Sequence, residues 1–233
     1  MKRKMMVLVA VVMAGIFSTA LFPMISTAET IYVNGTVSGT WSADTVIVTG
    51  HLYVENDDTL TIEPGVKVLF QTNPGSWYWR FYVRPDATLI AAGTEQDSIL
   101  FDVLNPNTGW NGLRIESSNG SSLLQYCHLT HGSTNGQGAT HYGGAIACDA
   151  SANPTIKNCL IDSCFATQGS AIWCTGSSSP IIEDNIIKDN TASTATIWSG
   201  INSSPLISKN LIIGNLTGSG GGGVSCFDNS NAI

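Results

Sequence analysis

The chain has 233 residues, of which 43% are hydrophobic and only 12% are charged. Its formal charge is −7, and the first 28 residues hold three of the ten basic residues and none of the seventeen acidic ones, so the remainder carries 7 − 17 = −10. A chain this acidic repels nucleic acid and anionic membrane surfaces, which excludes both as expected partners.

Residues 1–28 have the layout of an export signal. Basic residues occupy positions 2–4, an apolar run covers 5–22, and Ser26 and Ala28 are the small residues that a signal peptidase requires. We predict cleavage after Ala28 and therefore a secreted or cell-surface protein. The apolar run is also about long enough to cross a bilayer, so a retained N-terminal anchor is the alternative. We expect no other membrane association.

The next segments read as short strands separated by turns. We assign residues 29–58 to N-terminal capping strands, and "ENDD" at 55–58 to an ordinary turn rather than a cation site. Alternating strands broken by Gly, Pro, Asn and Asp follow at 59–70, 81–105 and 109–129. These patterns predict an all-β protein.

The second half of the chain repeats itself. The stretches "ANPTIKNCLIDSC", "SSPIIEDNIIKDN" and "SSPLISKNLIIGN" are variants of one unit. Three aliphatic columns recur at spacings of 25 to 27 residues, namely Ile156, Ile182, Ile207 and Ile233; Ile161, Ile187 and Ile212; and Ile146, Ile172, Ile197 and Val224. A unit of this length cannot bury its own apolar side, so successive units must stack and share a core.

Charged residues support the same register. Opposite charges lie one unit apart in three cases, Lys157 with Glu183, Asp162 with Lys188, and Asp184 with Lys209. Such neighbours are mildly favourable when identical units stack in parallel. The gap of 33 residues from Leu113 to Ile146 implies an inserted polar loop at 133–142.

These motifs carry a resemblance to a known family. The succession "TIEPGVKVLF", "ATLIAAGT" with "SILF", "WNGLRI" and then repeated P-x-I-x-x-N-x-I-x-x-N units resembles secreted bacterial right-handed parallel β-helix proteins. The resemblance covers residues 59–233 and implies a solenoid with coils of about 25 to 26 residues and the architecture of pectate lyases, without implying their activity. It also implies an asparagine ladder inside a turn at Asn185 and Asn210, shortened by Cys159 and Cys127.

The six cysteines are candidates for disulfides in an exported chain. The repeat places Cys148 under Cys174 and Cys127 under Cys159. Side chains of such neighbours point the same way and stay about as far apart as the strands, beyond the usual disulfide range. We therefore expect buried thiols, with Cys226 unpaired.

Two residue groups invite a functional reading. His128, His131 and His141 form the best metal candidate, but we favour loop and surface histidines, and we expect neither a metal nor a cofactor. Trp173 and Trp198 occupy equivalent outward positions. They are candidate carbohydrate-binding residues, and the alternative, which we favour, is an aromatic pair that shields its own sheet.

The acidic and basic residues do not form a recognisable catalytic signature. Glu116 and Asp149, beside the inserted loop, are the best candidates for a carboxylate pair, although their spacing does not show that they converge. Separately, the segment 76–82 is a second aromatic patch, and Arg80 and Arg84 are the positive charges nearest to it. We expect a non-catalytic module for surface adhesion or contact with a polysaccharide or cell-surface glycan. A polysaccharide lyase or glycoside hydrolase is the alternative.

The last residues read as an incomplete unit. "DNSNAI" at 228–233 aligns with "INSSPLI" minus its first residue. Stacked repeats need a polar cap, so we predict a fragment of a longer protein, which would be a monomer when capped.

Overall fold

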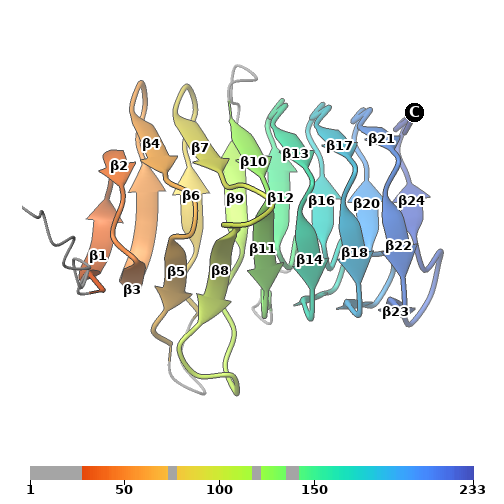
Figure 1. Ribbon diagram of the computed structural model, residues 1–233. Coiled ribbons are helices and arrows are strands. Elements are labelled where there is room, and N and C mark those ends of the chain that lie inside the picture. Colours follow the sequence, from red (N-terminus) through yellow and green to blue (C-terminus); the bar gives the residue numbers. More distant parts are fainter. Residues whose placement is uncertain (1–27, 73–77, 117–121, 135–141) are drawn as a thin grey trace, which may run out of the picture.

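The computed structural model describes residues 28–72, 78–116, 122–134 and 142–233. The chain winds into successive coils, and each strand pairs in parallel with the equivalent strand of the next coil (Figure 1). The expected all-β fold, a parallel β-helix, is confirmed. The described residues contain no apolar helix of membrane-spanning length.

The largest sheet covers two sides of the helix, joined by the ten-residue strand β3. On one side, called the β5–β22 face, lie β5 (Lys67–Phe70), β8 (Ile99–Val103), β11 (Cys127–Thr130), β14 (Leu160–Asp162), β18 (Ile186–Lys188) and β22 (Leu211–Ile213). On the other, called the β6–β24 face, lie β6 (Phe81–Val83), β9 (Leu113–Glu116), β12 (Ile146–Asp149), β16 (Ile172–Cys174), β20 (Ile197–Ser199) and β24 (Val224–Cys226).

Two smaller sheets complete each coil. The β2–β21 sheet contains β2 (Gly39–Trp41), β4 (Thr59–Ile62), β7 (Thr88–Ala92), β10 (Leu123–Gln125), β13 (Thr155–Lys157), β17 (Ile181–Glu183) and β21 (Leu206–Ser208). A short sheet at one corner contains β15 (Phe165–Ala166), β19 (Thr191–Ala192) and β23 (Leu216–Thr217).

The first strands belong to the same stack. β1 (Thr30–Thr36) pairs with β3 (Thr45–Val54), and β3 pairs with β5 through its first half and with β6 through its second. Whether residues 29–58 act as a cap stays a prediction. The proposed signal lies almost wholly outside the described residues, as does most of the inserted loop, whose ends at Ser133 and Tyr142 pair in register with Phe165 and Gln168.

At several corners the chain turns at residues whose backbone has a positive φ, in the left-handed region of conformation. Asp184 and Asp189, both at φ 54°, end β17 and β18, and each is followed by an inward-facing asparagine. Asn185 Oδ1 accepts from the N–H of Cys159, and Asn210 Oδ1 accepts from the N–H of Asn185, both at 2.9 Å. The predicted ladder of Asn185 and Asn210 is therefore confirmed, with Cys159 as its continuation.

A second ladder was not predicted. Asn190 Oδ1 accepts from the N–H of Cys164 at 2.9 Å, and Asn215 Oδ1 accepts from the N–H of Asn190 at 3.0 Å. The second asparagine of each repeat unit, which is Asn190 or Asn215, is the sequence feature from which this ladder could have been predicted. The two ladders satisfy buried backbone groups at two corners of each coil.

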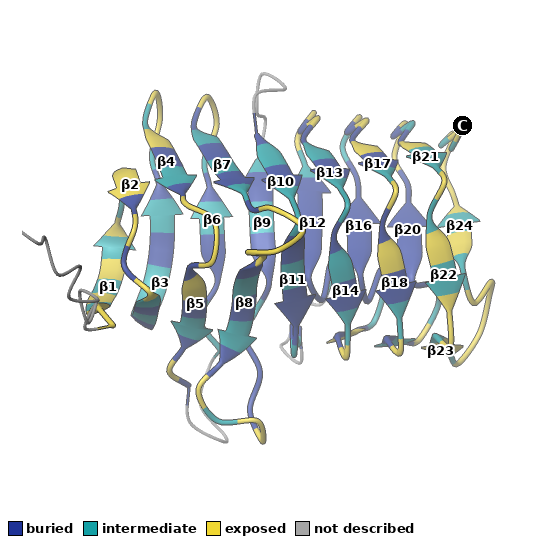
Figure 2. Cartoon of the chain, in the orientation of Figure 1, coloured by how far each residue is buried: buried dark blue, intermediate teal, exposed yellow. Residues whose placement is uncertain are grey.

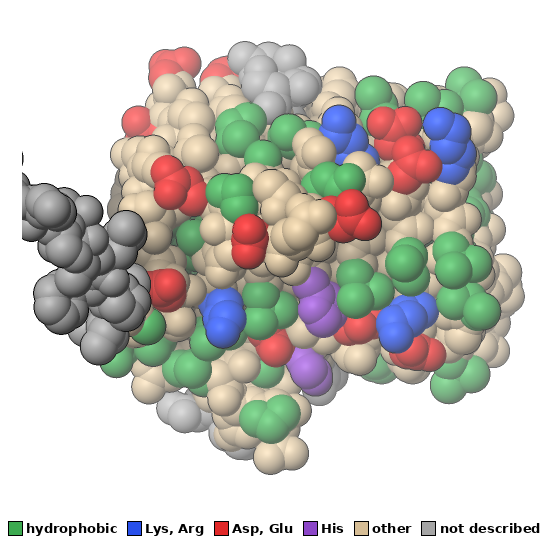
Figure 3. Space-filling model, in the orientation of Figure 1, with side chains coloured by type: hydrophobic (Ala, Val, Ile, Leu, Met, Phe, Trp, Pro, Cys, Tyr) green, Lys and Arg blue, Asp and Glu red, His purple; other side chains and the backbone are tan. Residues whose placement is uncertain are grey.

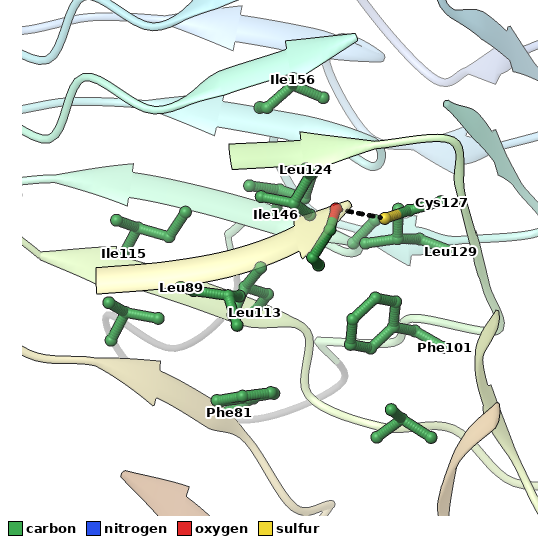
Figure 4. Close-up of a cluster of buried hydrophobic side chains, with 14 of the residues drawn as sticks. Phe81, Leu89, Phe101, Leu113, Ile115, Leu124, Cys127, Leu129, Ile146 and Ile156 are labelled. Carbon is green, nitrogen blue, oxygen red and sulfur yellow. Dashed lines mark hydrogen bonds between the residues drawn. The ribbon is translucent and has the colours of Figure 1, made fainter. Parts of the chain in front are cut away.

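The aliphatic columns form the core. Ile156 pairs with Ile182, Ile161 with Ile187, and Ile146 with Ile172, and all six side chains are fully buried. Figure 2 shows this burial along the stack and the rising exposure in the last coil, and Figure 4 shows core side chains from opposite faces pointing toward one another. The predicted register is confirmed, and the predicted interior is confirmed for the columns up to Ile182, Ile187 and Ile197. In the last coil Ile207 and Ile212 are half-buried, and Val224 and Ile233 are exposed.

The predicted charge pairs are only half right. Lys157 is the register partner of Glu183, and Asp162 is the partner of Lys188. The side chains of the second pair find other partners: His128 Nε2 lies 3.2 Å from Asp162, and Lys188 Nζ lies 3.7 Å from Asp189. For Lys157 with Glu183, and for the third predicted pair of Asp184 with Lys209, no ion pair is formed among the described residues.

The cysteines are free thiols, as expected. Five are buried and Cys226 is exposed. Cys148 and Cys174 are register partners. The Cys127 thiol donates to the carbonyl of Ala91 at 3.3 Å, the bond drawn in Figure 4. Burial raises the pKa of Cys164, and burial together with Cys159 raises that of Cys127.

We predict that Ile187→Ala lowers the free energy of unfolding by about 2 to 5 kcal/mol, because Ile187 is fully buried. Ile186→Ala is the matched control, since the neighbouring side chain is 45% exposed, and it should cost less than about 1 kcal/mol. Urea denaturation followed by circular dichroism measures both. Equal losses for the two variants would contradict an interior column at Ile187.

We also predict that at pH 8 a thiol reagent labels Cys226 rapidly and the five buried cysteines slowly. Burial shields all five from the reagent and raises the pKa of Cys127, Cys164 and Cys174, and the thiolate is the reactive form. After denaturation all six thiols should react. A total of four or two would show that disulfides are present.

Candidate functional site

The β6–β24 face carries the most varied set of outward side chains. In β9 the inward residues are Leu113 and Ile115, so Arg114 and Glu116 point outward. Register then lines up one outward column along the helix axis, consisting of Tyr53, Tyr82, Arg114, Ala147, Trp173 and Trp198.

An ion-pair network occupies the middle of this face. Arg84 Nη1 lies 3.0 Å from Glu116 Oε2, and Arg114 Nε lies 2.9 Å from Glu116 Oε1. Arg114 Nη2 also bonds to Asp149, the register partner of Glu116. Burial lowers the pKa of Arg84, but the hydrogen bond and charge of Glu116 outweigh it and raise that pKa above its usual value. The structure thus brings Glu116 and Asp149 together, with Arg114 bonded to both.

Stacked tyrosines lie at one end of the network. The rings of Tyr53 and Tyr82 are 5.2 Å apart and nearly parallel, and the Arg84 guanidinium lies 4.6 Å from the centre of the Tyr82 ring. Distances of this size are typical of cation–π contacts. The predicted aromatic segment 76–82 contributes Tyr82 here, whereas Ser76 and Trp77 lie outside the described residues. Tyr53 was missed, although the paired patterns "LYV" and "FYV" were a usable signal.

Arg80 is part of the same region but is buried. Its side chain is 1% exposed and donates to the carbonyl and the side-chain oxygen of Asn111, both at 2.8 Å. Burial lowers the pKa of Arg80 to about 10. Its backbone N–H donates to His51 Nδ1 at 3.1 Å, and burial lowers the pKa of His51. Arg80 therefore supports the face from beneath.

An aromatic ladder lies at the other end. Ring centres are 5.0 Å apart for Tyr142 and Trp173, 5.8 Å for Trp173 and Trp198, and 5.8 Å for Trp198 and Phe227, with all planes within about 20° of parallel. A Cβ atom at Gly200 would lie 2.0 Å from the Trp198 ring, so glycine is required there.

This ladder changes how the tryptophan pair is interpreted. Trp173 and Trp198 stack one coil apart as expected, but each is only 7% exposed. Both ring faces of each indole are covered by aromatic neighbours, so a sugar ring has no free indole face to stack on. The geometry favours the structural interpretation, and a carbohydrate-binding role for Trp173 and Trp198 stays a prediction.

The described histidines of the predicted metal candidate lie on another part of the molecule. His128 and His131 belong to the β5–β22 face and the corner beside it, where His131 Nδ1 lies 2.8 Å from Asp102. Figure 3 shows histidine side chains beside acidic ones on this side of the helix. Among the described residues no group of three or more His, Cys, Asp or Glu side chains is arranged to hold a metal ion. His141 lies outside them.

The segment 55–58 forms a turn. The N–H of Asp58 donates to the carbonyl of Glu55 at 3.0 Å, and Asp57 adopts a φ of 65°. Its acidic side chains lie at a corner of the coil.

Comparisons with known proteins bear on the fold. Residues 94–233, which are 140 of the 233 residues, match the family model described as "Right handed beta helix region". No curated protein and no solved structure matches the chain significantly.

We predict that Trp173→Ala lowers the free energy of unfolding by about 3 to 5 kcal/mol, because it removes a buried ring from the middle of the ladder. Phe227→Ala is the matched control: its ring is 49% exposed, and the loss should stay under about 1 kcal/mol. Thermal unfolding and urea titration measure both. If Trp173→Ala leaves the free energy of unfolding almost unchanged, the packing interpretation is contradicted, and an exposed platform for sugar rings becomes the better interpretation of the indole pair.

Proposed function

The chain belongs to the right-handed β-helix family, and we propose that it is an exported, non-catalytic module that holds a carbohydrate chain along the β6–β24 face. The observation that carries this proposal is the network of Arg84, Glu116, Arg114 and Asp149, flanked by stacked tyrosines, on one straight face. Export is supported by the composition of residues 1–28.

Carbohydrate suits this network chemically. Each sugar hydroxyl can donate and accept a hydrogen bond, so it can bridge a carboxylate and a guanidinium that lie side by side. The side chains of Arg84, Glu116, Arg114 and Asp149 are between 14% and 33% exposed, which leaves their outer atoms accessible while their positions are held. Such preorganisation lowers the entropic cost of binding.

The ladder spacing favours an extended partner. Equivalent residues recur about every 4.8 Å along the helix axis, the distance between neighbouring strands. The polar network spans β6, β9 and β12, and the tyrosine pair extends it toward β3. A linear polymer lying parallel to the axis would meet several coils at once, whereas a compact ligand would use only part of the face.

Catalysis is the less favoured function for this site. A glycoside hydrolase needs one carboxyl group that donates a proton and a second carboxylate. Here Glu116 and Asp149 both accept hydrogen bonds from Arg114, so neither is positioned as the proton donor. A lyase needs a base that removes a proton. The three arginines of this face are all engaged by hydrogen bonds or ion pairs.

We predict that the protein binds at least one member of a panel of neutral and acidic polysaccharides without cleaving it. Affinity electrophoresis measures binding, and reducing-end assays together with absorbance of unsaturated sugar ends measure cleavage. Tyr82→Ala with Arg84→Ala should weaken binding about tenfold or more, the loss expected for one or two hydrogen bonds to charged groups.

Lys188→Ala is the control for this experiment, because Lys188 lies on the opposite β5–β22 face. Circular dichroism verifies that each variant folds. Release of new sugar ends would show cleavage and would contradict the proposal of a non-catalytic module. Binding that depends on Lys188 but not on Tyr82 and Arg84 would place the contact on another face.

A further inference from the structure

We infer that the β6–β24 face selects a neutral glycan over one that carries uronic acid groups, an inference that rests on the proposed function. Its basis is the charge balance of the face. Recognition of a polyanion requires basic groups that are free to pair with it. We therefore compare the basic and acidic groups of this face.

The arginines of the face are balanced by acidic groups. Arg84 pairs with Glu116, and Arg114 pairs with Glu116 and Asp149. Glu55 adds its negative charge to the surroundings of Arg84. Arg80 is 1% exposed and bonded to Asn111, so it does not present its charge at the surface. At the surface two arginines, Arg84 and Arg114, thus face three carboxylates, 2 − 3 = −1, so the face has no surplus positive charge.

The remaining basic side chains lie elsewhere. Lys67 and Lys188 belong to the β5–β22 face, Lys157 belongs to the β2–β21 sheet, and Lys209 follows the last strand of that sheet. Burial lowers the pKa of His51, which keeps this ring neutral at pH 7. The charge of −10 over residues 29–233 adds a general repulsion toward polyanions.

A uronate would therefore meet carboxylates without a free counter-charge. Brought into hydrogen-bond reach of Glu116 or Asp149, it must either compete for Arg84 and Arg114 or remain beside a like charge. Like charges across an interface are a recognised source of discrimination. A neutral hydroxyl avoids this cost, because it donates to a carboxylate oxygen and accepts from a guanidinium N–H.

The face also keeps hydrogen-bonding capacity in reserve. Among the described residues Arg84 donates one hydrogen bond, through Nη1, and a guanidinium has five N–H donors. A sugar hydroxyl can accept from Arg84 while it donates to Glu116, whereas a carboxylate that accepts from Arg84 would lie beside the like charge of Glu116.

The test compares glycans that differ only in charge. Linear neutral oligosaccharides and their forms oxidised at C6 to carboxylates are titrated against the protein by isothermal calorimetry. The neutral member of at least one pair should bind about tenfold more tightly, and its affinity should change little between low and high salt. Equal or tighter binding of the oxidised member would overturn the inference while leaving the proposed function in place. Absence of binding to either member would overturn both.

A charge-removal variant makes the test sharper. Glu116→Gln with Asp149→Asn removes two negative charges and releases Arg84 and Arg114 from their partners. The ratio of acidic to neutral affinity should rise about tenfold or more, and the acidic binding should weaken with salt. Glu183→Gln with Asp184→Asn removes the same charge at the end of β17, away from this face, and should leave the ratio unchanged.

An unchanged ratio in both double variants would overturn the inference, because Glu116 and Asp149 would then not be the discriminating groups. If the Glu116 and Asp149 variant fails to fold by circular dichroism, the salt series and the matched glycan pairs on the unaltered chain decide the question by themselves.

Discussion

Parallel stacking of successive coils in register is the constraint on which the rest of the molecule depends. Each coil hydrogen-bonds to the next along its strands, so a residue is held against its equivalent one coil away. The left-handed corner residues and the asparagines behind them set where each coil bends. Because the side chains alternate, a shift of one residue would turn every isoleucine column outward.

The same constraint creates the candidate site. Stacking converts residues that are about thirty positions apart into direct neighbours, as for Tyr53 and Tyr82 or Glu116 and Asp149. Rings therefore stack into ladders, and charged side chains bridge adjacent coils. A consequence is that aromatic side chains in such a column shield one another, which explains why Trp173 and Trp198 contribute more to packing than to an open surface. The contact that we propose with a glycan therefore uses the polar part of the face.

The sequence predicted the core well because the aliphatic residues repeat with nearly constant spacing. It predicted the site less well for identifiable reasons. The sequence singled out Glu116 and Asp149 as a pair, but the irregular gap between Leu113 and Ile146 gave no sign that they are register partners or that Arg114 bonds to both. Tyr142 and Phe227, which cover the outer faces of the tryptophan pair, lie outside the regular strands, Tyr142 in an isolated bridge with Gln168 and Phe227 directly after β24. The charge register was right, but His128, from the adjacent strand, takes Asp162.

The most direct test of the account measures the stack itself. Thr61, Ile90, Leu123, Thr155, Ile181 and Leu206 form one outward column. Spin labels at Thr61→Cys and Leu206→Cys, in a chain with Cys226→Ser, should be separated by five strand spacings, about 24 Å. Pulsed electron paramagnetic resonance measures this distance. A value near 24 Å supports continuous in-register stacking from β4 to β21, and a clearly longer or broad distribution would contradict it.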